Sequence, residues 1–323
     1  MGQDGSVFRG ESMKFMFAAL LLLGPVVEAG HAGELYQDQG YKLVNGVNHF
    51  YRISGEGETF IVLHGGPGMY HDELFPFFQD FAQTHRVIFY DQRGNGRSAM
   101  ATIDSSNFTT DLMVEDLEGL RQAFGIDKLN IIGHSWGGLL AMYYTVRYPS
   151  NVKRLITVDS APVNTRLLIQ SYENQISRFS EDEWKYLQGL WESEAYLAGD
   201  PDVHNEAMRL SEGSVFYNKA VIDTYMDAAA FNADTARNAV SLNDLSRDMK
   251  LNITVQDGLS RITCPTLIIQ GKHDFIVPES SQLAHQLIVN SEVVFIEDSG
   301  HYPFVENPVD FFAALNSFIE RTR

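Results

Sequence analysis

The feature of this sequence that most constrains its fold is a short serine motif between a strand pattern and a helix pattern. The motif reads Gly-His-Ser-Trp-Gly at residues 133–137, after an apolar run at 129–132 and before a helical pattern at 136–148. Glycines on both sides permit a turn so tight that the Ser135 hydroxyl projects above a sheet at the start of a helix. A serine needs a base to become a nucleophile, so the motif predicts a base and an acid elsewhere in the chain.

Strand and helix patterns alternate around this motif. An Asn-Gly turn at 45–46 predicts a β-hairpin over residues 41–54. Further strands are predicted at 60–63, 87–90 and 155–158, and residues 74–82 and 111–124 show helical spacing. Such alternation favours a mostly parallel sheet with helices on both faces.

The alternation stops after Ala161 and resumes about a hundred residues later. Residues 162–255 are rich in helix formers and aromatic side chains, whereas strands at 266–269 and 293–296 and helices at 279–288 and 308–320 follow. The sequence therefore predicts an α/β fold with an inserted helical cap. The expected division is a core at 33–161, the cap at 162–255 and the rest of the core at 256–323.

Residues 1–32 have the pattern of a targeting segment rather than of folded structure. Met13 and Lys14 precede an apolar run at 15–23, and small residues near Ala29 and Ala32 suit a cleavage site. The pattern predicts a signal peptide and a secreted or periplasmic protein. The alternative is an N-terminal extension on a cytoplasmic protein.

Charge and cysteine content exclude some classes of partner. The chain has 24 Lys and Arg against 42 Asp and Glu, a net charge of −18. This surface repels phosphate backbones and anionic lipid, so we expect neither nucleic acid nor membrane as a partner, whereas a cationic substrate would be attracted. Cys264 is the single cysteine, which excludes an intramolecular disulfide, and we expect it to be a small buried side chain.

The base and acid are expected beyond the ends of later strands. Asp274 follows the strand at 266–269, and His301 follows the strand at 293–296. Carboxyl ends of parallel strands meet at one edge, where open α/β sheets bind ligands, so Ser135, Asp274 and His301 are predicted to form a catalytic triad. Asp298 is the alternative candidate for the acid of the triad, but it is so close to His301 in sequence that we interpret it as a turn residue. The other histidines show no metal-ligand spacing with acidic residues, so neither a metal nor another cofactor is expected.

Hydrolysis through a tetrahedral intermediate also requires donors to its oxyanion. The backbone N–H of Trp136, the residue after the serine, is one candidate. The other is Gly66 in the glycine-rich loop His-Gly-Gly-Pro-Gly at 64–68, where an amide can approach a substrate closely. A phosphate cradle is disfavoured because no Gly-Lys-Ser/Thr follows this loop.

With these residues in place, the chain resembles the prolyl aminopeptidase (proline iminopeptidase) family of α/β-hydrolases over about residues 40–321. The resemblance rests on five motifs: HGGPG at 64–68, YDQRGNGRS at 90–98, GHSWGG at 133–138, GKHDFIVP at 271–278 and SGHYPFVENP at 299–308. It implies the α/β-hydrolase fold and removal of N-terminal residues, often proline, from short peptides without a metal. It also implies that Ser135 attacks the scissile carbonyl, His301 carries the proton and Asp274 orients the imidazole.

The resemblance further implies that acidic side chains of the cap hold the substrate's free α-amino group. Residues 184–192 resemble the family's cap segment ending in Trp-Glu, which makes Glu192 the candidate. The alternative for Glu192 is a solvated side chain on a cap helix. The second acid has no clear counterpart, because residues 216–227 do not reproduce the family's pattern.

Two other functions stay open at the level of sequence. A carboxylesterase or lactonase would use the same triad with an apolar cap pocket and no amine anchor. A binding protein that kept the fold would be expected to have lost the triad, which is complete here. The expected partner is a small peptide, amide or ester substrate, and the sequence gives no oligomeric state.

Overall fold

The structure is a computed structural model that describes residues 37–323. Apolar runs and alternating patterns form eight strands in this range, joined in one sheet of order β1-β2-β4-β3-β5-β6-β7-β8. The strands are β1 (Asp38–Val44), β2 (Val47–Ser54), β3 (Glu58–Leu63), β4 (His85–Tyr90), β5 (Leu129–His134), β6 (Val152–Val158), β7 (Thr266–Gly271) and β8 (Ser291–Ile296).

The predicted hairpin is confirmed as β1 and β2. Its turn places Asn45 at φ 48° and Gly46 at φ 79°, both in the left-handed region, as a two-residue turn between twisted strands requires. β2 also pairs antiparallel with β4. All remaining neighbours from β3 to β8 pair parallel. The sheet is therefore mostly parallel, as the alternation of patterns predicted.

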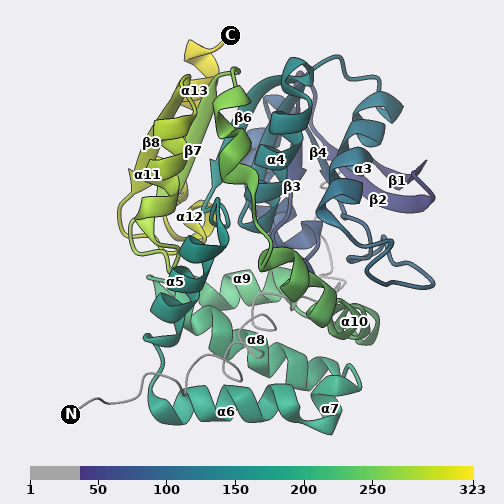
Figure 1. Ribbon diagram of the computed structural model, residues 1–323, viewed down its shortest axis with the longest axis vertical. Coiled ribbons are helices and arrows are strands. Elements are labelled where there is room, and N and C mark those ends of the chain that lie inside the picture. Colours follow the sequence, from purple (N-terminus) through teal and green to yellow (C-terminus); the bar gives the residue numbers. More distant parts are fainter. Residues whose placement is uncertain (1–36) are drawn as a thin grey trace.

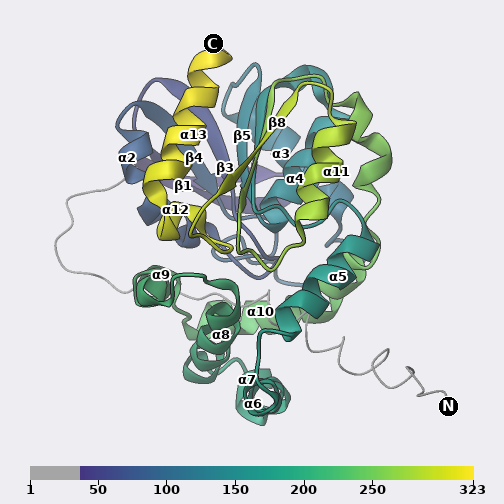
Figure 2. The ribbon, with the colours of Figure 1, turned by 90° about the vertical axis from the view of Figure 1, so that its left-hand side faces the viewer.

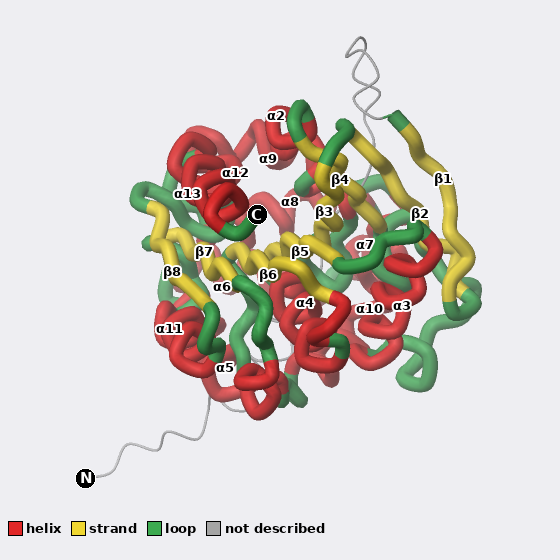
Figure 3. Tube along the Cα trace, turned by 90° about the horizontal axis from the view of Figure 1, so that it is seen from above, coloured by secondary structure: helices red, strands yellow, loops and turns green. Residues whose placement is uncertain are grey.

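Helices cover both faces of this sheet (Figures 2 and 3). One face carries α2 (Gln79–Ala82), α12 (Pro303–Glu306) and α13 (Pro308–Arg321), and the other carries α3 (Thr110–Ala123), α4 (Trp136–Arg147) and α11 (Pro278–Leu287). Because both faces are covered, all six residues of β5 and of β7 are buried. The stretch with helical spacing at 74–82 forms the short 3₁₀ helix η2 (Phe75–Phe78) followed by α2.

Between β6 and β7 the described chain forms helices and no strand. The α-helices of this stretch are α5 (Thr165–Ile176), α6 (Glu181–Glu192), α7 (Glu194–Leu197), α8 (Pro201–Val215), α9 (Ile222–Ala229) and α10 (Ala233–Lys250). We call α5 to α10 the helical cap. It lies beside one edge of the sheet, with α6 and α7 farthest from the strands (Figure 1). The chain after β5, β7 and β8 emerges at this edge, so residues there face the cap.

The remaining points concern the N-terminal segment and membrane-spanning helices. The expected signal peptide at 1–32 lies outside the described residues. Within residues 37–323, none of the helices has the length and apolar character needed to cross a membrane.

Candidate functional site

Ser135 stands in a strained turn between the end of β5 and the start of α4. Its backbone has φ 52° and ψ −120°, which a non-glycine residue rarely adopts. A Cβ on Gly133 would lie 2.3 Å from the carbonyl oxygen of Gly137, and a Cβ on Gly137 would lie 2.3 Å from that of Leu63. Glycine is therefore required on both sides of Ser135, because the chain passes too close for any side chain.

His301 lies in the loop after β8 and is held on three sides. Its Nδ1 is 2.9 Å from Oδ1 of Asp274. Its backbone N–H donates to the carbonyl of Val215 in the cap, and its own carbonyl accepts from Nε2 of His134. The ring is 1% exposed, and its Nε2 has no hydrogen-bond partner among the described residues. Burial lowers the pKa of His301, although the Asp274 carboxylate opposes this shift.

A further carboxyl group, unforeseen from the sequence, lies beside Asp274. Asp159 follows β6 at φ 44°, and its Oδ1 accepts from the backbone N–H of Gly271. Burial first, and then the Asp274 carboxylate, raise the pKa of Asp159 well above its ordinary value. The raised pKa favours a protonated Asp159, whose carboxyl group hydrogen bonds with the side chain of Asp274.

The same residues have the spacing of a metal site. Asp159, Asp274 and His301 each present one ligand atom, and these atoms lie within 4.8 Å of one another. A metal ion would need both carboxyl groups ionised, since only deprotonated groups act as ligands. The raised pKa of Asp159 favours a shared proton in this position instead.

The two candidate oxyanion donors lie beside Ser135. Gly66, at φ 97°, lines a small cavity of about 10 Å³ together with Ser135 and Trp136. The loop after β4 holds this arrangement: the Gln92 amide donates to the carbonyl of His64 at 2.8 Å and accepts from the Trp136 indole at 3.1 Å. The YDQRGNGRS motif thus fixes the glycine-rich loop against the start of α4.

A cluster of buried acids and tyrosines adjoins the candidate triad, and the sequence did not reveal it. Glu73 of η1 (His71–Glu73) accepts from the backbone N–H of Gly65. A Cβ built on Gly65 would lie 3.3 Å from both Oε1 of Glu73 and Cβ of Ser135, so this carboxylate is close to the serine. The Tyr225 hydroxyl lies 3.4 Å from Oε2 of Glu73 and 3.0 Å from the hydroxyl of Tyr302, the neighbour of His301.

Glu212 of α8 is the second acid of this cluster. The Tyr302 hydroxyl lies within hydrogen-bonding reach of its carboxyl, and Oε2 has no hydrogen-bond partner among residues 37–323. Burial raises the pKa of Glu212 to about 8, and the charge of Glu73 adds to the shift. No signal in the sequence separates Glu212 from a solvated glutamate, because its burial comes from packing between elements: α8 contacts α6, α7, α9 and α10.

Glu192, the acid proposed from the sequence, has a different position. It is the last residue of α6 and its side chain is exposed. α6 lies on the outer side of the cap, away from the strand ends (Figure 1). The structure brings Ser135, Asp274 and His301 to one edge of the sheet with Gly66 and Trp136, but it does not bring Glu192 to them.

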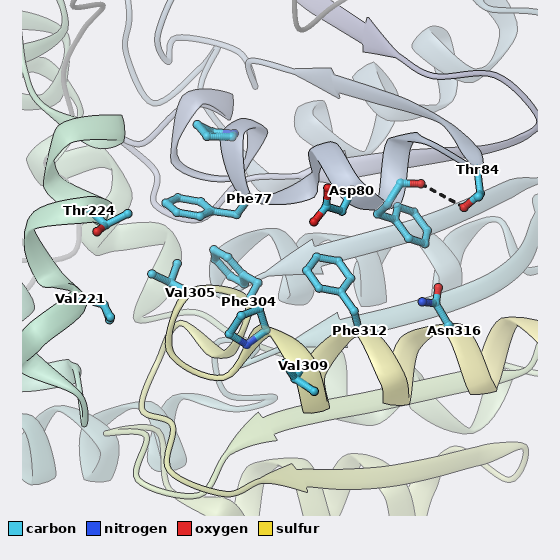
Figure 4. Close-up of a pocket in the computed structure, with 13 residues that line it drawn as sticks. Phe77, Asp80, Thr84, Val221, Thr224, Phe304, Val305, Val309, Phe312 and Asn316 are labelled. Atoms are coloured by element: carbon cyan, nitrogen blue, oxygen red, sulfur yellow. Dashed lines mark hydrogen bonds between the residues drawn. The ribbon is translucent and has the colours of Figure 1, made fainter. Parts of the chain in front are cut away.

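A larger hollow opens next to the site rather than at it. Its volume is about 580 Å³, and its walls come from η2, α2, α12, α13 and the start of α9. Phe77, Phe304 and Phe312 give it an apolar wall (Figure 4). Phe304 also contacts the His134 ring edge-on, with centroids 5.2 Å apart, and the His134 ring in turn lies 4.8 Å from that of His301, so the rings of Phe304 and His134 connect the wall of the hollow to His301.

Comparison with known proteins shows which family this chain belongs to and which proteins it is similar to. The α/β hydrolase fold family matches residues 58–308. The proline iminopeptidase of Heyndrickxia coagulans is 30% identical over 82% of this chain and 92% of that protein. The proline iminopeptidase of Saccharolobus solfataricus is 29% identical over 88% of this chain and 93% of that protein.

Solved structures share the fold at lower identity. The proline iminopeptidase of Mycobacterium smegmatis superposes with a TM-score of 0.62 and 21% identity, covering 88% of this chain and 98% of that one. A thermophilic esterase from Thermogutta terrifontis gives a TM-score of 0.66 and 20% identity, covering 88% and 99%.

Proposed function

Because this chain belongs to the α/β-hydrolase fold family and, within it, to the prolyl aminopeptidase family, we propose that it is a serine aminopeptidase acting on short peptides. The observation that carries the proposal is the buried pair Glu73 and Glu212 beside Ser135 and His301. Two carboxyl groups in a protein interior are costly unless a positive partner occupies the site. The free α-amino group of a peptide is such a partner.

The proposed reaction uses the groups at the sheet edge. Ser135 attacks the scissile carbonyl while Nε2 of His301 takes its proton, and Asp274 stabilises the imidazolium through Nδ1. The N–H groups of Gly66 and Trp136 receive the developing oxyanion. His301 then gives the proton to the leaving amine as the C–N bond breaks, which leaves the N-terminal residue as an ester on Ser135. Water attacks this ester while His301 takes its proton, the N-terminal amino acid is released, and the proton returns to the Ser135 oxygen. The lowered pKa of His301 keeps the ring neutral, and so able to accept a proton, at neutral pH.

Amine recognition in this proposal uses Glu73 and Glu212 rather than Glu192. Glu73 is fixed by Gly65 and Tyr225, whereas Glu212 has a free oxygen directed to no protein donor in the described chain. An ammonium group between them would stabilise the ionised form of Glu212 and offset its burial. Selectivity for a free N-terminus follows, because a blocked amine cannot satisfy both carboxyl groups.

An ester substrate is the second candidate, and one observation favours it. The cavity at Ser135 is lined by Leu168, Tyr172, Ile253, Phe275 and Ile276, which would accept an apolar acyl or alcohol group. A carboxylesterase or lactonase would use the same triad and make no use of Glu212.

The test compares substrates on purified residues 33–323. We would measure kcat/KM for L-prolyl and L-alanyl p-nitroanilides, for their N-acetylated forms, and for p-nitrophenyl acetate and butyrate. Ser135→Ala should lower every rate by three or more orders of magnitude, because the nucleophile is lost. Ser150→Ala, at an exposed position, is the matched control and should match the wild type.

The outcomes separate the two candidates. Hydrolysis of the free-amine anilides that disappears on acetylation supports the aminopeptidase. Ester turnover without preference for a free amine rejects the aminopeptidase and leaves the esterase. Unchanged turnover in Ser135→Ala would reject the assignment of the nucleophile itself.

A further inference from the structure

A buried lysine lines the cavity over Ser135, and the reaction described above gives it no role. Lys250 is the last residue of α10, and its side chain is 3% exposed. It lines the same cavity as Gly66, Ser135 and Trp136. Its Nζ has no hydrogen-bond partner within the described part of the chain. Burial lowers the pKa of Lys250 to about 7, the response expected of an amine with no negative partner.

Packing alone does not explain a lysine here. The neighbouring cavity residues are apolar or aromatic: Leu168, Tyr172, Ile253, Phe275 and Ile276. A methionine would fill a similar volume without the cost of burying an unpaired amine. The position therefore points to a ligand group that pairs with Lys250 when substrate is bound.

The surroundings restrict the chemistry of that group. Lys250 is the one cationic residue among those that line this cavity. A single ammonium in an apolar wall matches one negative charge, whereas a phosphate dianion requires several donors. A carboxylate is the monoanion that every unblocked peptide carries.

The amine and the carboxylate sites occupy different flanks of the serine. Glu73, Glu212 and Tyr225 come from η1, α8 and α9, whereas Lys250 comes from the end of α10 and shares its cavity with α5. Figure 2 shows α9 below α12 on one flank of the cap and α5 below α11 on the other. A substrate held at both ends would thus carry an ammonium and a carboxylate on either side of the scissile bond.

We propose that Lys250 binds the free C-terminal carboxylate of the substrate, so that the preferred substrates are zwitterionic dipeptides. The part of this inference that concerns the substrate's amino group rests on the proposed aminopeptidase function, whereas the carboxylate site at Lys250 does not. Lys250 and Ser135 line one small cavity, so the carboxylate lies within a residue or two of the scissile carbonyl, at about 3.5 Å per extended residue. Longer peptides would place an uncharged amide against the lysine. The cavity of about 10 Å³ holds no more than a water molecule, so substrate entry displaces side chains of α5 and α10.

The experiment compares prolyl-alanine with its C-terminal amide, which differ only in the carboxylate. The wild type should show kcat/KM higher by about tenfold or more for the free acid, the effect of one charge-assisted hydrogen bond. In Lys250→Met and Lys250→Gln this ratio should fall to about 1. Thermal unfolding of Lys250→Met should occur at an equal or higher temperature, because an unpaired buried amine is removed. Lys185→Met, on the exposed face of α6, is the control and should keep the wild-type ratio.

A second substrate pair separates this inference from the aminopeptidase. The ester 2-acetoxypropanoate places a carboxylate as prolyl-alanine does but has no amine, and 2-acetoxypropanamide lacks both charges. One outcome would be that the enzyme prefers 2-acetoxypropanoate to 2-acetoxypropanamide only when Lys250 is present, and does not hydrolyse peptides. This outcome would uphold the lysine site and reject the aminopeptidase function. The inference is overturned if the wild type does not distinguish acid from amide in either pair. It is also overturned if Lys250→Met lowers acid and amide equally, since the lysine would then act on structure or chemistry alone.

Discussion

The sheet edge and the helical cap position their polar groups in different ways. At the edge, backbone geometry holds the functional groups: Ser135 by its strained turn, and His301 by hydrogen bonds of its own N–H and C=O. In the cap, Glu212 and Lys250 are buried with polar atoms that lack partners in the described chain. Atoms without a hydrogen-bond partner also occur at the edge, such as Nε2 of His301, but there the backbone fixes the side chain that carries them. In the cap, by our proposal, a charged ligand supplies the missing partner.

This difference assigns chemistry and selectivity to separate regions. Groups that move protons must keep a fixed geometry, which turns at strand ends provide. Groups that select a substrate gain most when the unbound state leaves them unsatisfied, because the correct ligand then removes the cost of burial. Substitutions at the edge should therefore reduce turnover of all substrates, and substitutions in the cap should change the ranking of substrates.

The largest effect is expected at the acid of the sheet edge. Asp274→Asn should lower kcat for amides and esters alike by about 10³- to 10⁴-fold, because an amide neither stabilises the imidazolium nor keeps the required tautomer. Steady-state rates on both substrate classes provide the measurement. Asp298→Asn, at the exposed rival acid, should have little effect, and the reverse pattern would make Asp298 the acid. Asp159→Asn should lower kcat far less, because an asparagine can still donate to Asp274.

A smaller and selective effect is expected from the cap. Glu212→Gln should lower kcat/KM for free-amine anilides by about 10- to 100-fold and leave p-nitrophenyl esters within about twofold, because one charge-assisted contact to the ammonium is lost. Glu192→Gln, the acid proposed from the sequence, is the paired comparison and should retain wild-type selectivity. If Glu192→Gln loses the amine preference and Glu212→Gln keeps it, the amine site lies on α6 instead.

The pH dependence of kcat/KM should differ between ester and free-amine substrates. The additional rise with pH for free-amine substrates should be about tenfold. With ester substrates the rise of kcat/KM with pH should have its midpoint below pH 6.5, because the pKa of His301 is lowered from 6.5 and the neutral ring is the base. With free-amine substrates kcat/KM should rise further toward pH 8, because Glu212, with a pKa of about 8, pairs with an ammonium only once ionised. The second rise should be absent in Glu212→Gln. If the second rise in kcat/KM persists in Glu212→Gln, a group other than Glu212 causes it.

Metal removal should produce the smallest effect, and it tests the Asp159–Asp274–His301 cluster. Dialysis against EDTA should leave kcat/KM unchanged, because the pair Asp159 and Asp274 shares a proton in the arrangement described. Loss of activity that returns with added Zn²⁺ would reject both this proton assignment and the expectation of a metal-free hydrolase. Addition of Zn²⁺ to an undialysed sample is the control for inhibition by the metal.

The sequence by itself determined the sheet domain and the order of its strand-end residues. Turn requirements are local: Asn45-Gly46 predicted a hairpin, and the glycines around Ser135 predicted the serine turn, because each turn depends on backbone conformation within a few residues. The structure adds a contact between distant segments, since Gly137 also lies against the carbonyl of Leu63. Parallel pairing then brings the ends of β5, β7 and β8 to one edge, so the sequence alone was enough to place Ser135, Asp274 and His301 together.

The tertiary structure alone decided which side chains surround that edge. Asp159, Glu73, Glu212 and Lys250 have ordinary local sequences, and their burial arises from contacts between segments far apart in the chain. The packing of α8 and α10 against other cap helices and the neighbouring loops buries a glutamate and a lysine, each with a polar atom that has no partner in the described chain, while Glu192, with the more suggestive motif, is exposed. Burial is a property of packing between elements, and the cost of burying a charge depends on it, so no local pattern could have separated these residues.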